Sequence, residues 1–133
     1  MSGVVIPDEN LDQAEALLAA IRADLNRRPG DTLHWRNIKG HSQRLRIAQL
    51  ISQQGWLTIS SVVVCKAHLT GAPLDDDTAY LYTLRYLLER LSWLARDYKR
   101  VLTYTLAHIV RFKIQKLHNY EAILRRTPDC QIA

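Results

Sequence analysis

Short runs of β-branched residues alternate with longer segments of helical periodicity along this sequence. In the clearest run, residues 57–66, polar and apolar residues alternate before three valines follow in succession. Alternation that passes into a continuous apolar stretch is typical of a strand covered on both faces of a sheet. Because strands and helices follow one another in turn, the sequence predicts an α/β fold in which three to four strands are packed by four helices.

Four segments carry apolar residues at helical spacing. The first begins after Asn10, which forms a capping box with Gln13. In the second, the side chains expected to face the core are Leu45, Ala48, Leu50 and Ile51. The expected helices span about residues 11–25, 42–54, 75–98 and 112–126, and the other expected strands are residues 3–6 and 101–107.

The length of 133 residues, 47% of them apolar, is enough for one domain with its own core. Cys65 lies in an apolar run and Cys130 near the C-terminus, so we expect two reduced thiols and no disulfide framework. Residues 1–6 lack the basic and apolar parts of an export signal, and charges interrupt residues 84–95. We therefore expect a cytoplasmic protein without a membrane span.

Three adjacent aspartates, Asp75, Asp76 and Asp77, stand where the longest helix is expected to begin. Adjacent carboxylates can hold a divalent cation, but acids at a helix start also satisfy free N–H groups and the helix dipole. We favour capping, with metal binding as the alternative. Glu89 lies four residues after Arg85, so we favour an ion pair over a catalytic role.

Other catalytic motifs are absent from the sequence. The five histidines lack the spacing of a zinc site, no glycine-rich phosphate loop occurs, and no glycine-rich elbow follows Cys65. We therefore expect no resident metal and no cofactor, and Mg²⁺ only if the chain is a nuclease.

The net charge of +5 and the pI of about 9.5 favour an anionic partner, either a nucleic acid or an acidic protein. Two groups of basic residues have aromatic side chains nearby, the combination that nucleic-acid grooves use. The first group is Trp35, Arg36, Lys39, Arg44 and Arg46. The second group is Arg111, Lys113, Lys116, Arg125 and Arg126. A solvated basic face is the alternative interpretation of both.

Five blocks, in this order, carry a resemblance to a known family: Gly3-Val4-Val5-Ile6-Pro7, Leu33-His34-Trp35-Arg36, Val62-Val63-Val64-Cys65-Lys66, Tyr80-Leu81-Tyr82 and Leu87-Leu88-Glu89-Arg90-Leu91-Ser92-Trp93-Leu94-Ala95-Arg96. Together they resemble the prokaryotic family catalogued as domain of unknown function 3800. The resemblance implies an RNase H-like fold and metal-dependent phosphodiester chemistry associated with mobile elements and defence. Lys66 and Glu89 stand at positions that match the family.

The acidic motifs of that family are missing here. Metal-dependent phosphodiester chemistry needs two or more carboxylates on neighbouring strands to hold Mg²⁺. The family has Asp-Glu-Ser-Gly on its first strand and Leu-Gln-x-Ala-Asp near its C-terminus, and this sequence has neither. We therefore expect a partial RNase H-like sheet in a single truncated domain, residues 1–133, that binds rather than catalyses.

The partner of such a module is expected to be a protein or a nucleic acid. A core strand so near the start leaves a sheet edge open, which favours a docking protein or a homodimer. The family association suggests, as a narrower form, a phage or mobile-element protein that inhibits a defence complex. The alternatives are a divalent-metal nuclease that uses Glu89, Asp77 or Lys66, and a basic nucleic-acid-binding protein.

Overall fold

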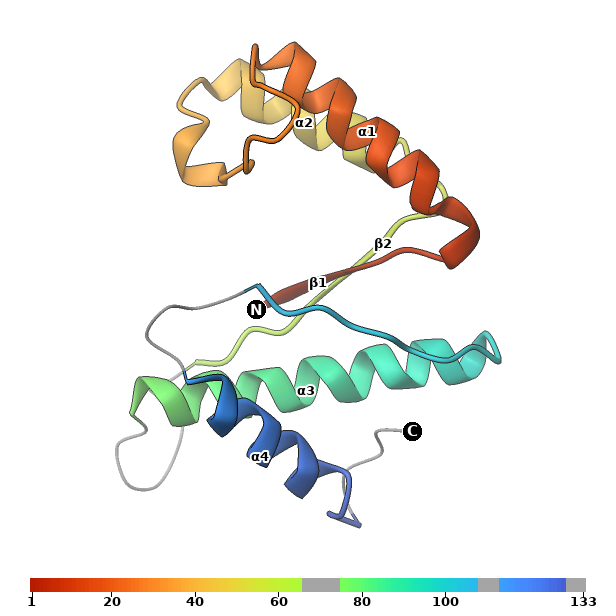
Figure 1. The fold of residues 1–133 in the computed structure, drawn as a ribbon, viewed down its shortest axis with the longest axis vertical. Coiled ribbons are helices and arrows are strands. Elements are labelled where there is room, and N and C mark those ends of the chain that lie inside the picture. Colours follow the sequence, from red (N-terminus) through yellow and green to blue (C-terminus); the bar gives the residue numbers. More distant parts are fainter. Residues whose placement is uncertain (66–74, 108–112, 129–133) are drawn as a thin grey trace. The chain divides into compact units, whose positions relative to one another are not determined.

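The computed structural model describes residues 1–65, 75–107 and 113–128, in which helices are combined with a sheet (Figure 1). These residues contain four α-helices and one antiparallel pair of strands, so the expected mixture of helix and strand is confirmed. The elements follow in the order β1 (Ser2–Val5), η1 (Asp8–Asn10), α1 (Leu11–Asp24), η2 (Trp35–Asn37), α2 (His41–Ser52), β2 (Thr58–Ser61), α3 (Asp76–Asp97) and α4 (Ile114–Leu124), where η marks a 3₁₀ turn. None of the helices in this described part is long and apolar enough to cross a membrane.

The chain divides into two compact units. One consists of Val4–Thr58 and contains α1 and α2, and the other combines Met1–Gly3 with Ile59–Ala133 and contains α3 and α4. We call them the α1–α2 unit and the α3–α4 unit. The chain passes from one unit to the other within β1 and again within β2.

Hydrogen bonds fix the register of the sheet within the α3–α4 unit. Met1 and Val62 exchange two backbone hydrogen bonds of 2.8 Å, as directly opposed residues of an antiparallel pair do. Ser2 therefore lies opposite Ser61, and their hydroxyl oxygens are 2.8 Å apart. The side chains of these two serines point to the same face of the sheet.

The sheet is smaller than the sequence predicts. Beyond the pair with Met1, residues 63–65 continue without strand pairing among the described residues, and Val63 is 92% exposed. Residues 101–107 are not a strand either, and in Figure 1 they run back along α3 as an irregular segment. Only Leu102 and Leu106 are half-buried there, a spacing of four that does not fit the two-residue period of a strand. The predictions of a strand at 101–107 and of a continuous strand to residue 66 are therefore wrong for the described residues.

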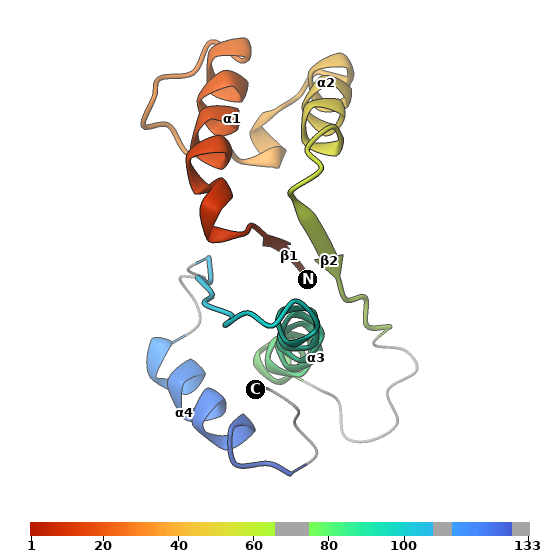
Figure 2. The same cartoon turned by 90° about the vertical axis from the view of Figure 1, so that its right-hand side faces the viewer.

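Helix α3 spans nearly the predicted residues and is the central element of the α3–α4 unit (Figure 2). Its leucines Leu84, Leu88 and Leu91 are buried. The strand β1 approaches the helix closely at Gly3, where a Cβ atom would lie 3.2 Å from Leu91 Cδ1. Glycine at this position therefore lets the strand backbone pack directly on the leucines of α3.

The α1–α2 unit has its own apolar core. Ile21, Ile38 and Ile47 are buried together, and the partly buried side chains that pack against them are Leu17, Leu25, Leu33, Leu50 and Ile51. On α2, Leu50 and Ile51 pack against this core as predicted, whereas the predicted Leu45 and Ala48 are exposed. Ile47 faces inward instead, and its burial with Leu50 and Ile51 removes one continuous apolar face of α2 from water.

The prediction of a capping box at the start of α1 is wrong. The helix begins at Leu11 as expected, but the Asn10 side chain accepts no hydrogen bond from the helix backbone. Asn10 Nδ2 donates instead to Gln13 Oε1 at 2.7 Å, so the two side chains bond to each other.

Candidate functional site

The aspartates at the start of α3 have structural partners. Asp75 caps the helix because its carboxylate accepts a hydrogen bond of 2.6 Å from the backbone N–H of Thr78. This bond stabilises the ionised form and holds the pKa of Asp75 below its ordinary value. Asp77 Oδ2 accepts a hydrogen bond of 2.9 Å from Lys116 Nζ on α4, which raises the pKa of Lys116. The predicted capping role is confirmed for Asp75.

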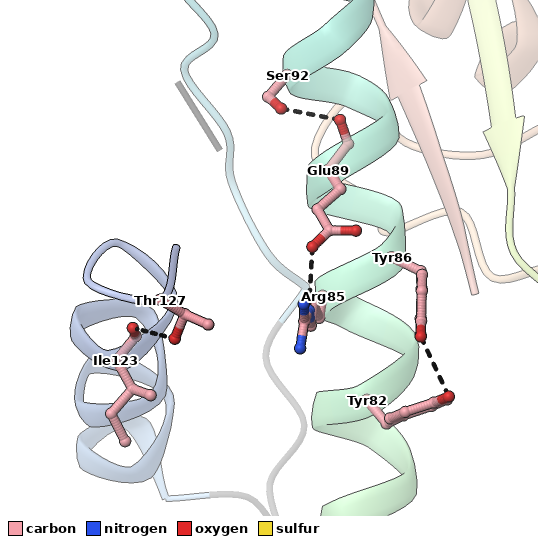
Figure 3. Close-up of polar contacts among 7 residues, drawn as sticks. All are labelled: Tyr82, Arg85, Tyr86, Glu89, Ser92, Ile123 and Thr127. Atoms are coloured by element: carbon pink, nitrogen blue, oxygen red, sulfur yellow. Dashed lines mark hydrogen bonds and ion pairs between the residues drawn. The ribbon is translucent and has the colours of Figure 1, made fainter. Parts of the chain in front are cut away.

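Glu89 is buried on α3 and is paired with an arginine one turn earlier. Arg85 Nε donates to Glu89 Oε1 at 3.0 Å, and the Ser92 hydroxyl donates to the Glu89 backbone carbonyl at 2.8 Å (Figure 3). The predicted ion pair is therefore confirmed. A buried carboxylate needs such a partner, because an uncompensated charge in the interior is strongly destabilising.

The acidic candidates are dispersed in the structure. Within residues 1–65, 75–107 and 113–128, no three His, Cys, Asp or Glu side chains are close enough together to hold a metal ion. Asp77 and Glu89 are bound to different cations, Lys116 and Arg85. Lys66, the third candidate for catalysis, lies outside the described residues.

The second basic group, on and around α4, is partly used in internal contacts. Lys116 binds Asp77, and Arg125 Nη2 binds Glu121 Oε1 at 2.8 Å. Glu121 also bonds to the Tyr104 side chain, and burial together with this bond raises the pKa of Tyr104 to about 12. The other predicted members of the group are Lys113 and Arg126, which are exposed, and Arg111, which lies outside the described residues.

The first basic group centres on a tryptophan in the α1–α2 unit. Trp35 is 52% exposed, and the Arg44 guanidinium lies over its ring at 5.5 Å from the ring centroid. Arg44 is fixed in this position because its Nε donates to the backbone carbonyl of Ile38 at 2.6 Å. Arg36 and Lys39 are exposed. We call Trp35, Arg36, Lys39 and Arg44 the Trp35 surface.

Arg46 has a different role from the other cations of this group. Its Nε donates to both carboxylate oxygens of Asp24 at 2.8 Å, which ties α2 to α1. This arginine therefore stabilises the helix pair, and its charge is largely compensated.

The structure also contains a groove that the sequence did not predict. It has a volume of about 590 Å³ and lies between residues 60–65 and one side of α3. The α3 side chains that line it, Tyr82, Tyr86 and Arg90, follow one another every four residues. The two tyrosine rings meet edge to face with centroids 4.9 Å apart, and their hydroxyl groups are hydrogen bonded at 3.2 Å (Figure 3). The four-residue spacing of these side chains can be read from the sequence. The sequence does not show that residues 60–65 lie opposite them.

No protein-family model, no curated protein and no solved structure matches this chain. Among the residues that the structure describes, the Trp35 surface and the groove beside α3 each combine aromatic side chains with an exposed cation that forms no ion pair.

Proposed function

We propose that this chain is a non-catalytic interaction module that binds single-stranded nucleic acid through the Trp35 surface. One observation carries the proposal: an exposed tryptophan is held under an arginine that is itself anchored to the backbone. A large exposed aromatic side chain contributes little to the core, whereas it is a ready platform for a nucleobase.

Stacking supplies the first part of the expected affinity. Every base has a π-face, so stacking on an aromatic ring tolerates any sequence and contributes about 1–3 kcal/mol per base. The anchored Arg44 restricts the ring of Trp35 before a ligand arrives. Less conformational entropy is therefore lost when a base stacks on the ring.

Charge supplies the second part. The sequence contains no acidic residue between Asp31 and Asp75, so the cations of the Trp35 surface have no sequence neighbours that would repel phosphates. Among the residues that the structure describes, Arg36 and Lys39 form no ion pair. Each phosphate that they neutralise releases a counterion, which adds affinity that depends on salt.

The non-catalytic part of the proposal is supported by the positions of the carboxylates. A nuclease that uses Glu89 or Asp77 would have to break the contacts with Arg85 or Lys116 before binding Mg²⁺. Incubation of the chain with Mg²⁺ or Mn²⁺ and a labelled oligonucleotide should give no cleavage. Cleavage that disappears in Glu89→Ala or Asp77→Ala would establish the nuclease alternative instead.

The binding test uses a fluorescein-labelled oligothymidylate of about 15 nucleotides, a length that spans a typical single-strand site. Fluorescence anisotropy should show saturable binding, with a slope of log K against log salt of about −0.7 for each phosphate contacted. Trp35→Ala should lower the affinity roughly fivefold to 100-fold by removing the stacking platform. Arg36→Gln and Lys39→Gln should each reduce the salt slope by about one contact.

Arg46→Gln is the matched control for these variants. It removes the same type of charge from a neighbouring position, but that charge is engaged by Asp24. Its effect on binding should therefore be small compared with that of Arg36→Gln. Equal losses in all the arginine variants, with no effect of Trp35→Ala, would reduce the surface to a non-specific basic face and refute the proposal.

A further part of the proposal concerns the RNase H-like fold and is limited to part of the chain. We propose that α3 and the two strands are the part of such a scaffold that the family-like blocks encode. A role as a mobile-element inhibitor of a defence complex follows from the same resemblance. An experimental structure of the whole chain in which further strands extend this two-stranded sheet would support the RNase H-like scaffold. A whole-chain structure in which the sheet has no strand beyond β1 and β2 would rule it out.

A further inference from the structure

We propose that the groove beside α3 is a docking site for an extended peptide of a partner protein, which adds as a strand beside Val63 and Val64 and places a carboxylate on Arg90. This surface lies in the α3–α4 unit and does not include any residue of the Trp35 surface. The proposal therefore goes beyond nucleic-acid binding and rests on different residues.

The segment that follows β2 has backbone groups without a strand partner among the described residues. Pairing with β1 reaches Val62, and among the described residues Val63 and Val64 have no strand partner. Val63 is also almost fully exposed, which is unusual for a β-branched apolar residue. A strand with free N–H and C=O groups is a template for another strand, and peptides bind sheet edges in this way.

The side chains on the opposite wall of the groove are spaced to match a strand. Tyr82, Tyr86 and Arg90 are separated by four residues each, which corresponds to about 6 Å along a helix. Alternate residues of a strand are separated by about 6.6 Å. In Figure 1 the segment after β2 runs along α3 toward the start of that helix. A peptide strand added to this segment would therefore present every second side chain to one of these three residues.

The positive charge of Arg90 favours a partner with a carboxylate. Arg90 is exposed, its guanidinium lies 4.8 Å from the Trp93 ring centroid, and no acidic residue lines the groove. Within the described part of the chain Arg90 forms no ion pair. A carboxylate on the peptide would supply the missing partner, and the edge-to-face tyrosine pair would receive apolar side chains.

A peptide fits these features better than a nucleic acid does. One wall of the groove is an extended backbone, whose alternating donors and acceptors match another backbone rather than a row of phosphates. Only one cation, Arg90, is among the lining residues, whereas a nucleic-acid channel tracks the phosphates with several. The expected occupant therefore has apolar residues at alternate positions followed by an acidic residue.

The test uses a capped, fluorescein-labelled peptide with the sequence Leu-Thr-Val-Thr-Glu and a version with glutamine in place of the glutamate. Anisotropy should show that the full chain binds the first peptide more tightly. Arg90→Gln should weaken binding of the glutamate peptide about fivefold and abolish the preference between the two, as expected for a solvent-accessible pair. Arg90→Glu should reverse the preference in favour of a peptide with lysine at the last position.

Two N-methylated peptides test the strand geometry. Methyl groups on every second amide, placed in one register or the other, block alternate hydrogen bonds along the backbone. If the peptide adds as a strand, one of the two versions should lose binding and the other should retain it. Equal binding of both versions, or no saturable binding of any peptide, would overturn the proposal.

Arg96→Gln is the control on the same helix, because Arg96 is exposed, faces Asp97 and is not among the groove residues. It should bind both peptides as the unchanged chain does, and far-UV circular dichroism should show the same helix content in all variants. Trp35→Ala should also leave peptide binding unchanged, so failure of one proposal is distinguishable from failure of the other. Displacement of the peptide by oligothymidylate in the Trp35→Ala variant would assign the groove to nucleic acid and overturn the peptide proposal.

Discussion

Two arginines, Arg85 in the α3–α4 unit and Arg44 in the α1–α2 unit, illustrate two different uses of a positive charge. Arg85 on α3 is mostly buried and pairs with Glu89, whose side chain is only 9% exposed. Arg44 on α2 lies over Trp35, a residue with more than half of its surface in contact with solvent. Both arginines are fixed, but only the second is fixed beside a surface that a ligand can reach.

The comparison shows why a basic residue near an aromatic one does not by itself indicate a binding site. In the α3–α4 unit, Lys116, Arg125 and Arg85 all have carboxylate partners. In the Trp35 surface, Arg44 contacts an aromatic ring and a backbone carbonyl, neither of which neutralises its charge. The compensation of charge, rather than the number of cations, separates the stabilising groups from the candidate binding groups.

The largest effect on stability is expected from Arg85→Ala. The substitution leaves the Glu89 carboxylate buried without its ion pair, and we expect a loss of about 2 kcal/mol in the free energy of unfolding, less than for a fully buried pair because Arg85 is partly exposed. Urea denaturation followed by circular dichroism at 222 nm measures this loss. Replacing both partners, with Arg85→Met and Glu89→Leu, should restore much of the stability because no buried charge is then left.

Arg44→Ala is the matched variant in the other unit. It removes one hydrogen bond to a backbone carbonyl and the contact with the Trp35 ring but leaves no buried charge unpaired, so the expected loss is about 1 kcal/mol. A loss as large as that of Arg85→Ala would mean that the Trp35 surface is held for structural reasons. The distinction between the two arginines would then fail.

The sequence predicts well those features that depend on residues close together along the chain. The limits of α3, the cap at Asp75 and the Arg85–Glu89 pair all depend on residues within four positions of one another, so local patterns predict them. Residues 101–107 were wrongly predicted as a strand because pairing depends on a distant neighbour. On α2, Leu50 and Ile51 are predicted correctly, but the choice of Ile47 in place of Leu45 and Ala48 depends on packing against distant residues such as Ile21.

The candidate sites, too, can be predicted from the sequence only where their residues are close together along the chain. Trp35 and its neighbouring cations are close in sequence, so the local sequence is enough to indicate the Trp35 surface as a candidate site. The exclusion of Arg46 from it depends on Asp24, which lies 22 residues away on another helix. The groove joins residues 60–65 to Tyr82, Tyr86 and Arg90, and no sequence pattern links segments so far apart.

A second pair of variants compares how tightly the chain is packed in the two units. At Gly3 a Cβ atom would lie 3.2 Å from Leu91 Cδ1, whereas at Gly55 nothing lies within 4 Å. Gly3→Ala should therefore cost about 1 kcal/mol of stability through overpacking against α3. Gly55→Ala should be neutral or stabilising by about 0.5 kcal/mol, because it restricts the unfolded chain without a clash.

The outcome of this pair is read from urea denaturation midpoints at constant m-value. If Gly3→Ala were as stable as Gly55→Ala, the close approach of β1 to α3 would be absent in solution. The pairing of Met1 with Val62, and with it the position of the groove wall, would then need revision.

A smaller effect is expected at the start of α3. Asp75→Ala removes the acceptor for the Thr78 N–H and should lower the urea midpoint, whereas Asp97→Ala at the other end of the helix should change it little. The pKa of Asp75 is depressed in the folded state, so its contribution is present above the ordinary value of 3.8 and is lost as the pH falls through the lower folded value. The midpoint difference between wild type and Asp75→Ala should therefore shrink in strong acid, and a difference that persisted there would exclude the carboxylate as its source.

The smallest effect is expected at alkaline pH, where the ionisation of tyrosines can be followed by absorbance in one unit without a contribution from the other. All six tyrosines lie between residues 80 and 120, so phenolate absorbance reports on the α3–α4 unit alone. Burial and the bond to Glu121 raise the pKa of Tyr104 from 10.0 to about 12. The stability that this group contributes is complete below pH 10.0 and is lost as the pH rises toward about 12, because the unfolded chain ionises first. The difference in absorbance at about 295 nm between wild type and Tyr104→Phe should titrate near the raised value. A difference that titrated at the ordinary pKa of 10.0 would mean that Tyr104 does not bond to Glu121 on α4.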